Sequence, residues 1–432
     1  MALFGRKKKR NIVEEPVVVA EPPTLPAPPA PNEAGLRGVQ DHLDYLLSLI
    51  EPLPPFGMQL LEACDQTLCE DLSVMSAVPP VDLATMDGYA VRAEDVDMAR
   101  RAEPVELRIV EFVGDQLEPG TAMPVVARTA MPPGADAVLP ERFATVEGGR
   151  VKAQERVSRR EYVTCAGSAM AIGTPLMSSG DRLDARHIGL LAGAGIDKVF
   201  VRPRPRVVVL SSGDDILEPG VEMSVSDQTW DANSYLIAAA AKAAGAQVWR
   251  VGIVGNDPVK LRETVTDQLI RADLVISTTG SQRDYERIKD VLHETGLTDF
   301  TEVAMVPGKT QGFGLVGDDR VPMILLPGNP VSAYVSFHVF VRPLLRKLMG
   351  VEQVEHVPVR ALATSMLRSG LGQMQFMRGV VHMERGVRKV DPVHDPDPLR
   401  ELSRCNALIM LDESTDVVRA GESVMCWLLD ED

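Results

Sequence analysis

Three loops in the middle of the chain carry the residue types that bind phosphates and divalent cations. Each loop follows a short apolar segment and combines glycine with hydroxyl, carboxylate or amide side chains. Small residues let a backbone approach a phosphate closely, and carboxylates are ligands for Mg²⁺. Together the loops predict a ligand that carries phosphates. They are Ser211-Ser212-Gly213-Asp214-Asp215, Ser277-Thr278-Thr279-Gly280-Ser281 with Asp284 shortly after it, and Pro327-Gly328-Asn329-Pro330-Val331-Ser332.

The segments around these loops alternate between strand-like and helix-like hydrophobic periods. Alternating strands and helices with buried apolar strands predict a doubly wound, mostly parallel sheet. Ligands of such sheets bind at the carboxyl ends of the strands, which is where all three loops fall. The last helix also begins directly after its loop and offers N–H groups to an anion. Strands are predicted at 207–210, 248–254, 274–277 and 323–326, and helices at 234–244, 259–271, 284–294 and 331–348.

The remaining segments differ from this alternation. Residues 1–34 contain the basic run Arg6-Lys7-Lys8-Lys9-Arg10 and then seven prolines, which predicts a disordered, extended segment. Short Val-rich stretches broken by Gly and Pro predict a small all-β domain at 75–165, and short strands predict a β-rich domain over the last 80 residues. Helical spacing of apolar residues predicts helices at 43–50, 58–72 and 185–194.

Composition excludes several classes of protein. The 432 residues have a formal net charge of −16 at pH 7 and only 4% aromatic residues, which argues against nucleic-acid binding. Five scattered cysteines without histidines at ligand spacing favour reduced thiols in a cytoplasmic protein over a zinc site. No apolar run approaches the ~20 residues that cross a bilayer. The basic run is interpreted first as a solvated tail, and second as a weak contact to an anionic membrane surface or an acidic partner.

Five motifs occur in a fixed order along the chain. They are Met86-Asp87-Gly88-Tyr89-Ala90-Val91-Arg92, Ser212-Gly213-Asp214, Asp231-Ala232-Asn233, Pro307-Gly308-Lys309 and Leu326-Pro327-Gly328-Asn329-Pro330-Val331-Ser332-Ala333. In this order and spacing they resemble the MoeA family of molybdopterin molybdotransferases, which is homologous to the E domain of gephyrin. The resemblance covers residues 36–432.

The resemblance implies a multi-domain α/β fold and an elongated homodimer with an active site shared between subunits. In the family, adenylylated molybdopterin and molybdate bind there with Mg²⁺. The adenylate is then hydrolysed and the metal enters the dithiolene. The implied parts are an elongated subdomain I at 35–74 and 166–203, an inserted β subdomain II at 75–165, a MoeA/MogA-like molybdopterin-binding α/β subdomain III at 204–350 and a carboxyl-terminal β subdomain IV at 351–432.

The resemblance also assigns site residues. For an active enzyme the catalytic residues are Asp87, Asp214, Asp215 and Lys309, with Asp214 and Asp215 as the magnesium ligands. Taken alone, Asp87 is equally explained as a turn aspartate that caps its own backbone. The cofactor-binding residues are Ser212, Gly213, Asp231, Gly280, Ser281, Asp284, Pro327, Gly328, Asn329, Pro330 and Ser332.

Several positions depart from the family pattern. A site for pyrophosphate, Mg²⁺ and molybdate needs lysines, carboxylates and glycine N–H groups that converge. Here Val306 stands for one phosphate-facing lysine, Arg128 stands near the place of a glycine, and a loop rich in carboxylates has become Cys165-Ala166-Gly167-Ser168-Ala169. The loop before Asp284 is also changed and includes Arg283, and a serine pair has become Arg400-Glu401. These departures predict relaxed chemistry.

Two functions compete. The first is a repurposed dimeric scaffold that binds tail peptides of partner proteins, as gephyrin does and as the chain's similarity to actinobacterial gephyrin-like (Glp) proteins of cell division implies. The implied partners are the FtsZ carboxyl-terminal tail and a membrane receptor, at the septum or membrane, and the implied peptide groove includes Asp41, Asp44 and Tyr45. The alternative is an active molybdopterin molybdotransferase that uses molybdopterin, molybdate and Mg²⁺. A molybdopterin binder without turnover lies between the two.

Overall fold

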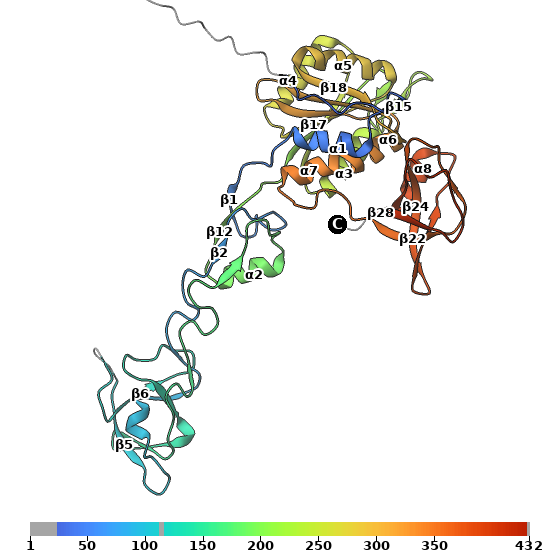
Figure 1. Cartoon of the computed structure of the whole chain (residues 1–432). Helices are drawn as coiled ribbons and strands as arrows, with labels where there is room; N and C mark the ends of the chain where they lie inside the picture. The colour runs from blue at the N-terminus through green and yellow to red at the C-terminus, as the bar shows by residue number, and fades with distance from the viewer. Residues whose placement is uncertain (1–23, 112–115, 430–432) are drawn as a thin grey trace, which may run out of the picture. The chain divides into compact units, whose positions relative to one another are not determined.

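The computed structural model describes residues 24–111 and 116–429, which form two compact units (Figure 1). The predicted basic run lies outside the described residues, and residues 24–32 form no helix or strand. The exact subdomain boundaries implied by the resemblance remain predictions. Among the described residues, unit 1 contains 24–50, 205–345 and 355–429, and unit 2 contains 51–111, 116–204 and 346–354.

Unit 1 is built around a six-stranded sheet with the strand order β16-β13-β17-β21-β20-β18. The first four strands are parallel, and the last two are antiparallel to their neighbours. This order confirms the predicted doubly wound, mostly parallel α/β fold. The strands are β13 (Arg206–Ser212), β16 (Gln247–Val254), β17 (Leu274–Thr279), β18 (Gly296–Glu302), β20 (Thr310–Val316) and β21 (Val321–Leu325).

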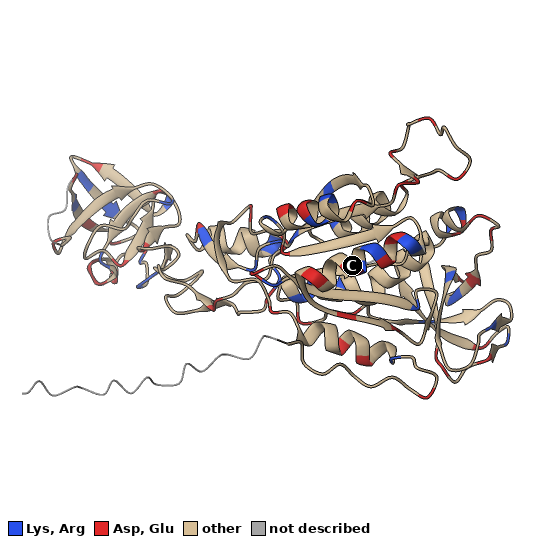
Figure 2. Ribbon diagram, turned by 90° about the horizontal axis from the view of Figure 1, so that it is seen from above, with Lys and Arg blue, Asp and Glu red and all other residues tan. Residues whose placement is uncertain are grey.

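The inner strands of this sheet are buried on both faces. Every residue of β17 and all but the first residue of β13 are buried, because helices cover both sides of a parallel sheet. Figure 2 shows that charged residues lie mostly on the helices and loops around the sheet strands. The parallel register places Ser212 beside both Thr279 and Val254. The carboxyl ends of β13, β16 and β17 therefore meet at one edge.

Capping side chains fix where the helices of unit 1 begin. Asp257 caps α4, Ser281 caps α5 and Asn329 caps α6, each by accepting hydrogen bonds from N–H groups of the first turn. The last helix continues without interruption through a π-helical turn. The helices are α3 (Asn233–Ala243), α4 (Pro258–Leu269), α5 (Gln282–Thr295), α6 (Pro330–Ser336), the π-helical η3 (Phe337–Val341) and α7 (Arg342–Leu348).

A second sheet forms the carboxyl-terminal part of unit 1. Its order is β19-β24-β25-β22-β28-β26, and an additional pairing of β24 with β26 closes five of these strands into a barrel. Helix α8 (Pro398–Arg404) packs against α6 and β24. The strands are β19 (Met305–Val306), β22 (Val359–Ala363), β24 (Met374–Glu384), β25 (Val387–Pro392), β26 (Ala407–Leu411) and β28 (Ser423–Leu428), and shorter pairs join β14 (Ile216–Leu217) to β15 (Thr229–Trp230) and β23 (Leu367–Arg368) to β27 (Val417–Val418).

Helix α1 (Val39–Ser48) is anchored to unit 1 by a buried ion pair. The two Nη atoms of Arg37 donate to the two carboxylate oxygens of Asp299 on β18, at 2.6 and 3.1 Å. The side chains of this pair are only 5% and 11% exposed. His42 lies against the same guanidinium, with 3.0 Å between Nη1 and Nδ1, and burial lowers its pKa to about 3. His42 is therefore a neutral core residue.

Unit 2 consists of paired strands and one larger sheet. A six-stranded sheet has the order β7-β4-β6-β5-β9-β8, which confirms a β domain in this region, and helix α2 (Ala185–Gly193) confirms the helix predicted there. Two 3₁₀ turns cover Ala93–Val96 and Glu141–Phe143. The strands are β1 (Phe56–Gln59), β2 (Leu72–Ser73), β3 (Leu83–Ala84), β4 (Gly88–Val91), β5 (Val105–Ile109), β6 (Thr121–Val125), β7 (Ala137–Pro140), β8 (Ala144–Glu147), β9 (Arg150–Ala153), β10 (Val163–Thr164), β11 (Pro175–Met177) and β12 (Lys198–Val201).

The helix predicted at 58–72 is wrong. Residues 56–59 form β1, which pairs antiparallel with β12, and Leu72 lies in β2, which pairs with β11. Between them, the N–H of Leu68 donates to the carbonyl of Asp181 at 2.8 Å. Backbone groups of this segment therefore bond to distant parts of the chain, and these tertiary ladders override the local helical spacing.

The buried ion pair predicts a large stability effect. Asp299→Ala leaves the Arg37 guanidinium buried without its carboxylate, so we expect the free energy of unfolding of unit 1 to fall by about 3 to 5 kcal/mol. Urea unfolding followed by tryptophan fluorescence reports this unit, because Trp230, Trp249 and Trp427 all belong to it. The control Glu384→Ala removes an exposed pair with Lys389 and leaves the midpoint unchanged. Equal midpoints for both variants would contradict the anchoring role.

Candidate functional site

The three predicted loops come together at one edge of the central sheet. The N–H of Gly280 donates to the carbonyl of Ser212 at 3.2 Å, which joins the first loop to the second. A Cβ on Gly328 would lie 2.7 Å from the carbonyl oxygen of Thr279, so only glycine lets the third loop approach the second this closely. We call this edge the strand-end site. A pocket of about 270 Å³ opens there, lined by Thr279, Gly280, Ser281, Tyr285, Thr310, Pro327, Gly328 and Asn329.

Six buried polar atoms in and near the strand-end site have no hydrogen-bond partner among the described residues, and two of them, on Thr279 and Tyr285, belong to residues that line the pocket. Buried polar groups are rarely left unpaired, so these atoms indicate a place for a ligand or ordered water. Burial also raises the pKa of Tyr285, which keeps its hydroxyl protonated as a donor. The atoms are Ser212 Oγ, Asn233 Oδ1, Asn256 Oδ1, Ser277 Oγ, Thr279 Oγ1 and the Tyr285 hydroxyl.

Two carboxylates of the site are joined through one amide. Asn256 Nδ2 donates to Asp214 at 3.0 Å and to Asp284 at 2.7 Å, and its backbone N–H donates to Asp214 at 2.9 Å. These hydrogen bonds lower the pKa of Asp214, the backbone bond contributing most. Asp284 is buried and also accepts from Ser281 Oγ at 2.7 Å. The first two predicted loops thus form one hydrogen-bonded network, with Asn256 as its centre.

The predicted magnesium pair is not a complete metal site. Asp214 and Asp215 are both exposed, and within the described part of the chain no group of three or more His, Cys, Asp or Glu side chains could hold a metal ion. Mg²⁺ commonly takes one or two carboxylates and completes its shell with water and substrate phosphates. Asp214 and Asp215 fit that limited share, so Mg²⁺ stays a prediction.

Some predicted ligand residues serve the fold. Asp231 is buried, and its carboxylate accepts from the backbone N–H and the hydroxyl of Ser234 at 3.0 and 2.5 Å, in the first turn of α3. The carboxylate thus has a structural role in the fold, and its predicted ligand contact stays a prediction. Asn329 Oδ1 is likewise used as the cap of α6, although Asn329 still lines the pocket. Pro330 and Ser332 belong to the same first turn but do not line the pocket.

Other predicted residues lie in different surroundings. Lys309 forms an ion pair with Glu302 at 2.8 Å, so its charge is partly neutralised. Asp87 lies in unit 2, where its carboxylate accepts from the N–H of Ala127 at 2.8 Å, a partner 40 residues away and not the backbone of its own turn. Arg128 also lies in unit 2 and has the left-handed backbone value φ = 68°. Arg283 is an exposed residue of α5.

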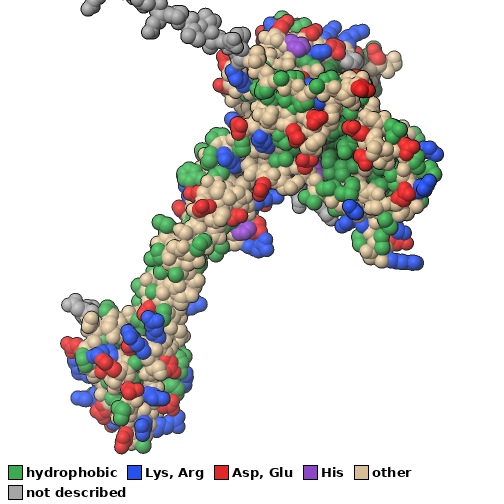
Figure 3. All heavy atoms as spheres, in the orientation of Figure 1, with side chains coloured by type: hydrophobic (Ala, Val, Ile, Leu, Met, Phe, Trp, Pro, Cys, Tyr) green, Lys and Arg blue, Asp and Glu red, His purple; other side chains and the backbone are tan. Residues whose placement is uncertain are grey.

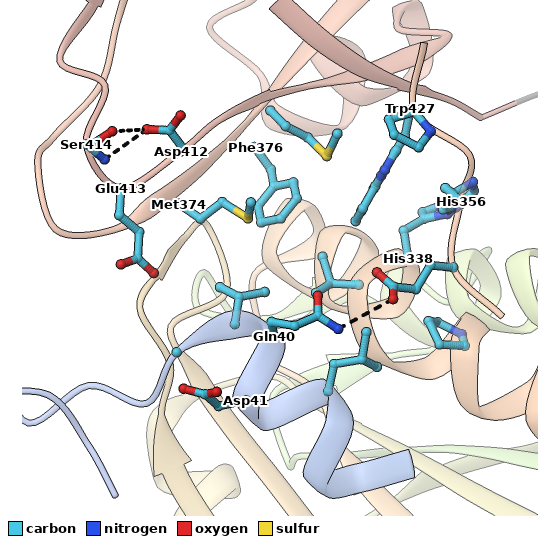
Figure 4. A pocket seen from close by; sticks show the side chains of 18 residues that line it. Gln40, Asp41, His338, His356, Met374, Phe376, Asp412, Glu413, Ser414 and Trp427 are labelled. Carbon is cyan, nitrogen blue, oxygen red and sulfur yellow. Dashed lines mark hydrogen bonds between the residues drawn. The ribbon is translucent and has the colours of Figure 1, made fainter. Parts of the chain in front are cut away.

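A second cavity, of about 660 Å³, lies between α1, the η3–α7 helix and the carboxyl-terminal sheet (Figures 3 and 4). We call it the groove. Its floor is apolar, with Leu43, Met374, Phe376, Met410 and Trp427 among its members. In Figure 4, Asp41 and Glu413 lie on one side of the cavity, and His356 and Trp427 lie on the other. The other lining residues are Gly38, Val39, Gln40, His338, Val339, Pro343, Glu355, His356, Pro358, Asp412 and Ser414.

The structure supports one of the three predicted groove residues. Asp41 lines the groove. Asp44 is exposed and accepts from Gln40 Nε2 at 3.0 Å without lining the cavity. Tyr45 is 6% exposed, lies beside Arg37, and donates its hydroxyl to the carbonyl of Pro26 at 3.1 Å. The prediction of Tyr45 is therefore wrong, because Tyr45 occupies the inner face of α1, and that of Asp44 stays a prediction.

Several residues of both sites are not among the predictions. Asn256 follows the end of β16, so the rule that points to strand ends could have found it. Tyr285 lies one helical turn after Ser281 and reaches the same pocket. The aromatic residues of the groove, Phe376 and Trp427, come from separate strands of the carboxyl-terminal sheet, and no local signal predicts that they meet α1.

Comparisons with known proteins match this architecture part by part. Three family models match the chain. They are the MoeA N-terminal region (domain I and II) at residues 37–195, a probable molybdopterin binding domain at 208–347 and the MoeA C-terminal region (domain IV) at 360–429. Molybdopterin molybdenumtransferase 2 of Mycobacterium tuberculosis is 32% identical over 407 residues, which cover 91% of this chain and 99% of the relative. The chain belongs to the MoeA family.

Further members of the MoeA family agree. Molybdopterin molybdenumtransferase 1 of the same bacterium is 33% identical over 424 residues, covering 90% of this chain and 98% of the relative. The crystal structure of a MoeA protein from Pyrococcus horikoshii has a TM-score of 0.77 and 25% identity, covering 92% of this chain and 100% of that one. These matches confirm the family and its multi-domain architecture. Within the described residues, no helix is long and apolar enough to span a membrane.

The hydrogen bonds of Asn256 predict a change in the titration of Asp214. Asn256→Ala removes the side-chain donor and keeps the backbone donor, so the pKa of Asp214 rises part of the way to its ordinary value. Carboxyl ¹³C NMR across a pH series measures this rise. Asp184 in unit 2, whose pKa is lowered by Arg186 and backbone donors, serves as the internal control and does not move. An unchanged pKa of Asp214 would show that the side-chain amide of Asn256 does not donate a hydrogen bond to it in solution.

Proposed function

We propose that this MoeA-family protein binds molybdopterin at the strand-end site and acts as a molybdopterin molybdotransferase. The observation that carries the proposal is a pocket of about 270 Å³ at the carboxyl ends of the parallel strands, lined by two residues, Thr279 and Tyr285, whose buried hydroxyls have no partner among the described residues. The names of the Mycobacterium tuberculosis relatives, both molybdenumtransferases, support the same activity. They favour the enzyme over the scaffold as the first function of the chain.

The unpaired atoms match the chemistry of a phosphorylated pterin. The free oxygens of Asn233 and Asn256 can accept from amino and ring N–H groups of the pterin. The hydroxyls of Thr279 and Tyr285, which line the pocket, can donate to ring carbonyl or phosphate oxygens. Small residues in the loops leave the backbone accessible to the phosphate. The site therefore provides binding and orientation, which are the contributions a protein makes to a transfer between two bound substrates.

The carboxylates of Asp214 and Asp215 are the predicted ligands of Mg²⁺. The lowered pKa of Asp214 keeps it ionised at neutral pH, and Asp215 lies exposed beside it. Mg²⁺, when bound, would neutralise substrate phosphate charge next to these groups. Lys309 is available to the site only in competition with Glu302. Because Val306 also replaces a lysine, the proposed enzyme has less positive charge than the family pattern provides, and we expect slow turnover.

The direct test is cofactor formation by the purified full-length chain. The protein is incubated with adenylylated molybdopterin, molybdate and Mg²⁺, and active cofactor is measured by reconstitution of a cofactor-free nitrate reductase. Cofactor formation above the protein-free rate is expected. If no cofactor forms but labelled molybdopterin still binds, the protein is a binder without turnover. The absence of both binding and turnover would refute the proposed function.

Two adjacent threonines give a matched pair of variants. Thr279 Oγ1 is unpaired and lines the pocket, whereas Thr278 Oγ1 donates to Ser211 Oγ at 3.3 Å. We expect Thr279→Val to lower the transfer rate about tenfold, the worth of one hydrogen bond to the ligand, without loss of stability. Thr278→Val keeps the rate within about twofold and slightly lowers the melting temperature. The same rate for both variants would argue against a ligand at Thr279.

A second function, binding of partner tail peptides, is favoured by the groove. The groove is larger than the strand-end pocket and is mostly apolar, and α1 contributes its first turn to it. A cavity of this kind can bury one or two apolar side chains of a peptide. In detail, we propose that the partners are the FtsZ tail and a membrane receptor, that the protein is recruited to the septum, and that it forms a homodimer. Light scattering of the full chain tests the homodimer.

A pair of methionines on one strand tests the groove. Met374 lines the groove, and Met383, also on β24, is 63% exposed outside it. We expect Met374→Arg to abolish the heat of binding of the FtsZ carboxyl-terminal tail in calorimetry, because the new cation fills the apolar floor. Met383→Arg leaves the affinity within about twofold, as surface substitutions usually do. No heat with the unsubstituted chain at high micromolar peptide would exclude this partner.

A further inference from the structure

We propose that residues 3–10 of this chain occupy the groove of the same molecule and restrict its access to partner peptides. The proposal rests on the second function above, the binding of peptides in the groove, and adds its regulation. Three observations carry it: the charge of the groove, the sequence of residues 3–10, and the place where the described chain begins.

The groove combines an apolar floor with acidic side chains at its edge. Asp41, Asp412 and Glu413 are exposed residues of its lining, and no Lys or Arg is found among the described lining residues. Hydrogen bonds from Ser414 and Thr415 lower the pKa of Asp412, so this carboxylate is ionised at neutral pH. Of the two histidines that line the groove, His338 adds no positive charge at neutral pH, because burial lowers its pKa well below its usual value. The complementary ligand therefore has apolar side chains followed by cations.

The chain contains one segment with this pattern near its amino end. Leu3 and Phe4 are followed, after Gly5, by five consecutive basic residues, 6–10. The apolar pair matches the floor of Met374, Phe376 and Met410, and the basic run matches the acidic edge. The rest of the chain is acidic overall, since the formal net charge is −16 even with this run included. The segment is thus the strongest cationic feature available to the groove within the molecule.

The described chain begins within reach of the groove. The carbonyl of Pro26 accepts from the hydroxyl of Tyr45 on α1, at 3.1 Å. Asp41, at the edge of the groove, is four residues earlier on the same helix, a separation of about 6 Å along the axis. The 22 residues from Phe4 to Pro26 can extend up to about 70 Å, so they reach the groove with slack. A tether of this length gives an effective concentration in the millimolar range.

The experiment places a photo-crosslinker in the full-length chain. Phe4 is replaced by p-benzoylphenylalanine, which reacts with nearby methionines, and crosslinked peptides are mapped by mass spectrometry. We expect crosslinks to Met374 or Met410, which line the groove. Mixing isotopically labelled and unlabelled chains separates crosslinks within one molecule from those between two. Crosslinks to other regions, or only between chains, would overturn the proposal.

Charge variants test the complementarity. Neutralising the run with R6Q, K7Q, K8Q, K9Q and R10Q abolishes the crosslink, and so does D41N combined with E413Q. The control D318N combined with D319N changes two exposed carboxylates of unit 1 outside the groove and retains the crosslink. Raising NaCl from 50 to 500 mM also lowers the crosslink yield, because salt screens the exposed carboxylates of Asp41, Asp412 and Glu413. Yields that do not respond to these changes would contradict electrostatic docking.

A free peptide separates this proposal from the function on which it rests. The probe is a fluorescein-labelled peptide of residues 2–12, added to the full chain and to the five-residue neutralised variant. If residues 3–10 occupy the groove for about 90% of the time, the variant binds the probe about tenfold more tightly than the full chain. Equal affinities of the full chain and the neutralised variant for the probe would refute self-docking. If Met374→Arg still abolishes probe binding, the groove remains a peptide site. No binding to either chain would refute self-docking, and the FtsZ titration would then decide the function of the groove.

Discussion

Pairing of β13 with β16 on one side and β17 on the other determines where chemistry can occur in unit 1. The parallel register puts Ser212, Val254 and Thr279 at the same level, so the loops after the three strands leave the sheet together. Gly213 follows with φ = 153°, and a Cβ there would lie 2.9 Å from Ile216 and 3.0 Å from the Asp284 carboxylate. A slip by one residue would turn Thr279 away from the pocket and break the bridge through Asn256. The strand-end site is thus a consequence of sheet register.

The strand-end part of this arrangement follows from sequence. Continuous apolar runs between helical segments define a parallel sheet, and the loops that follow them identify Ser212, Gly280, Ser281 and Asn329 before any coordinates are considered. The sequence does not show whether a polar residue of such a motif binds a ligand or stabilises the fold. Asp231 has the type and spacing of a ligand residue, yet its carboxylate is consumed by Ser234. That outcome depends on burial and local geometry, which the motif alone does not carry.

Residues of the groove were harder to predict because they converge from distant parts of the chain. Tyr45 shares a helical face with His42 and Leu46, and this spacing indicates the inner side of α1. Its acidic neighbours Asp41 and Asp44 suggest an exposed face instead, and only Asp41 reaches the cavity. The antiparallel edge β18–β20 is similarly hidden from pattern analysis, since β18 is polar and half-buried. Yet β18 supplies Asp299, which holds Arg37 and therefore the start of α1.

One helix connects the two sites. Asn329 caps its beginning at the strand-end pocket, and His338, Val339 and Pro343 line the groove two to four turns later. The π-helical turn at Phe337–Val341 lies at this second position, and His338 Nδ1 and His356 Nε2 are 2.9 Å apart there. π-Helical turns are rare and are frequently found at functional sites. Here the π-helical turn lies beside the groove and not beside the strand-end pocket. The same continuous helix thus joins a loop that the sequence points out, at its start, to a cavity whose lining residues converge from distant parts of the chain.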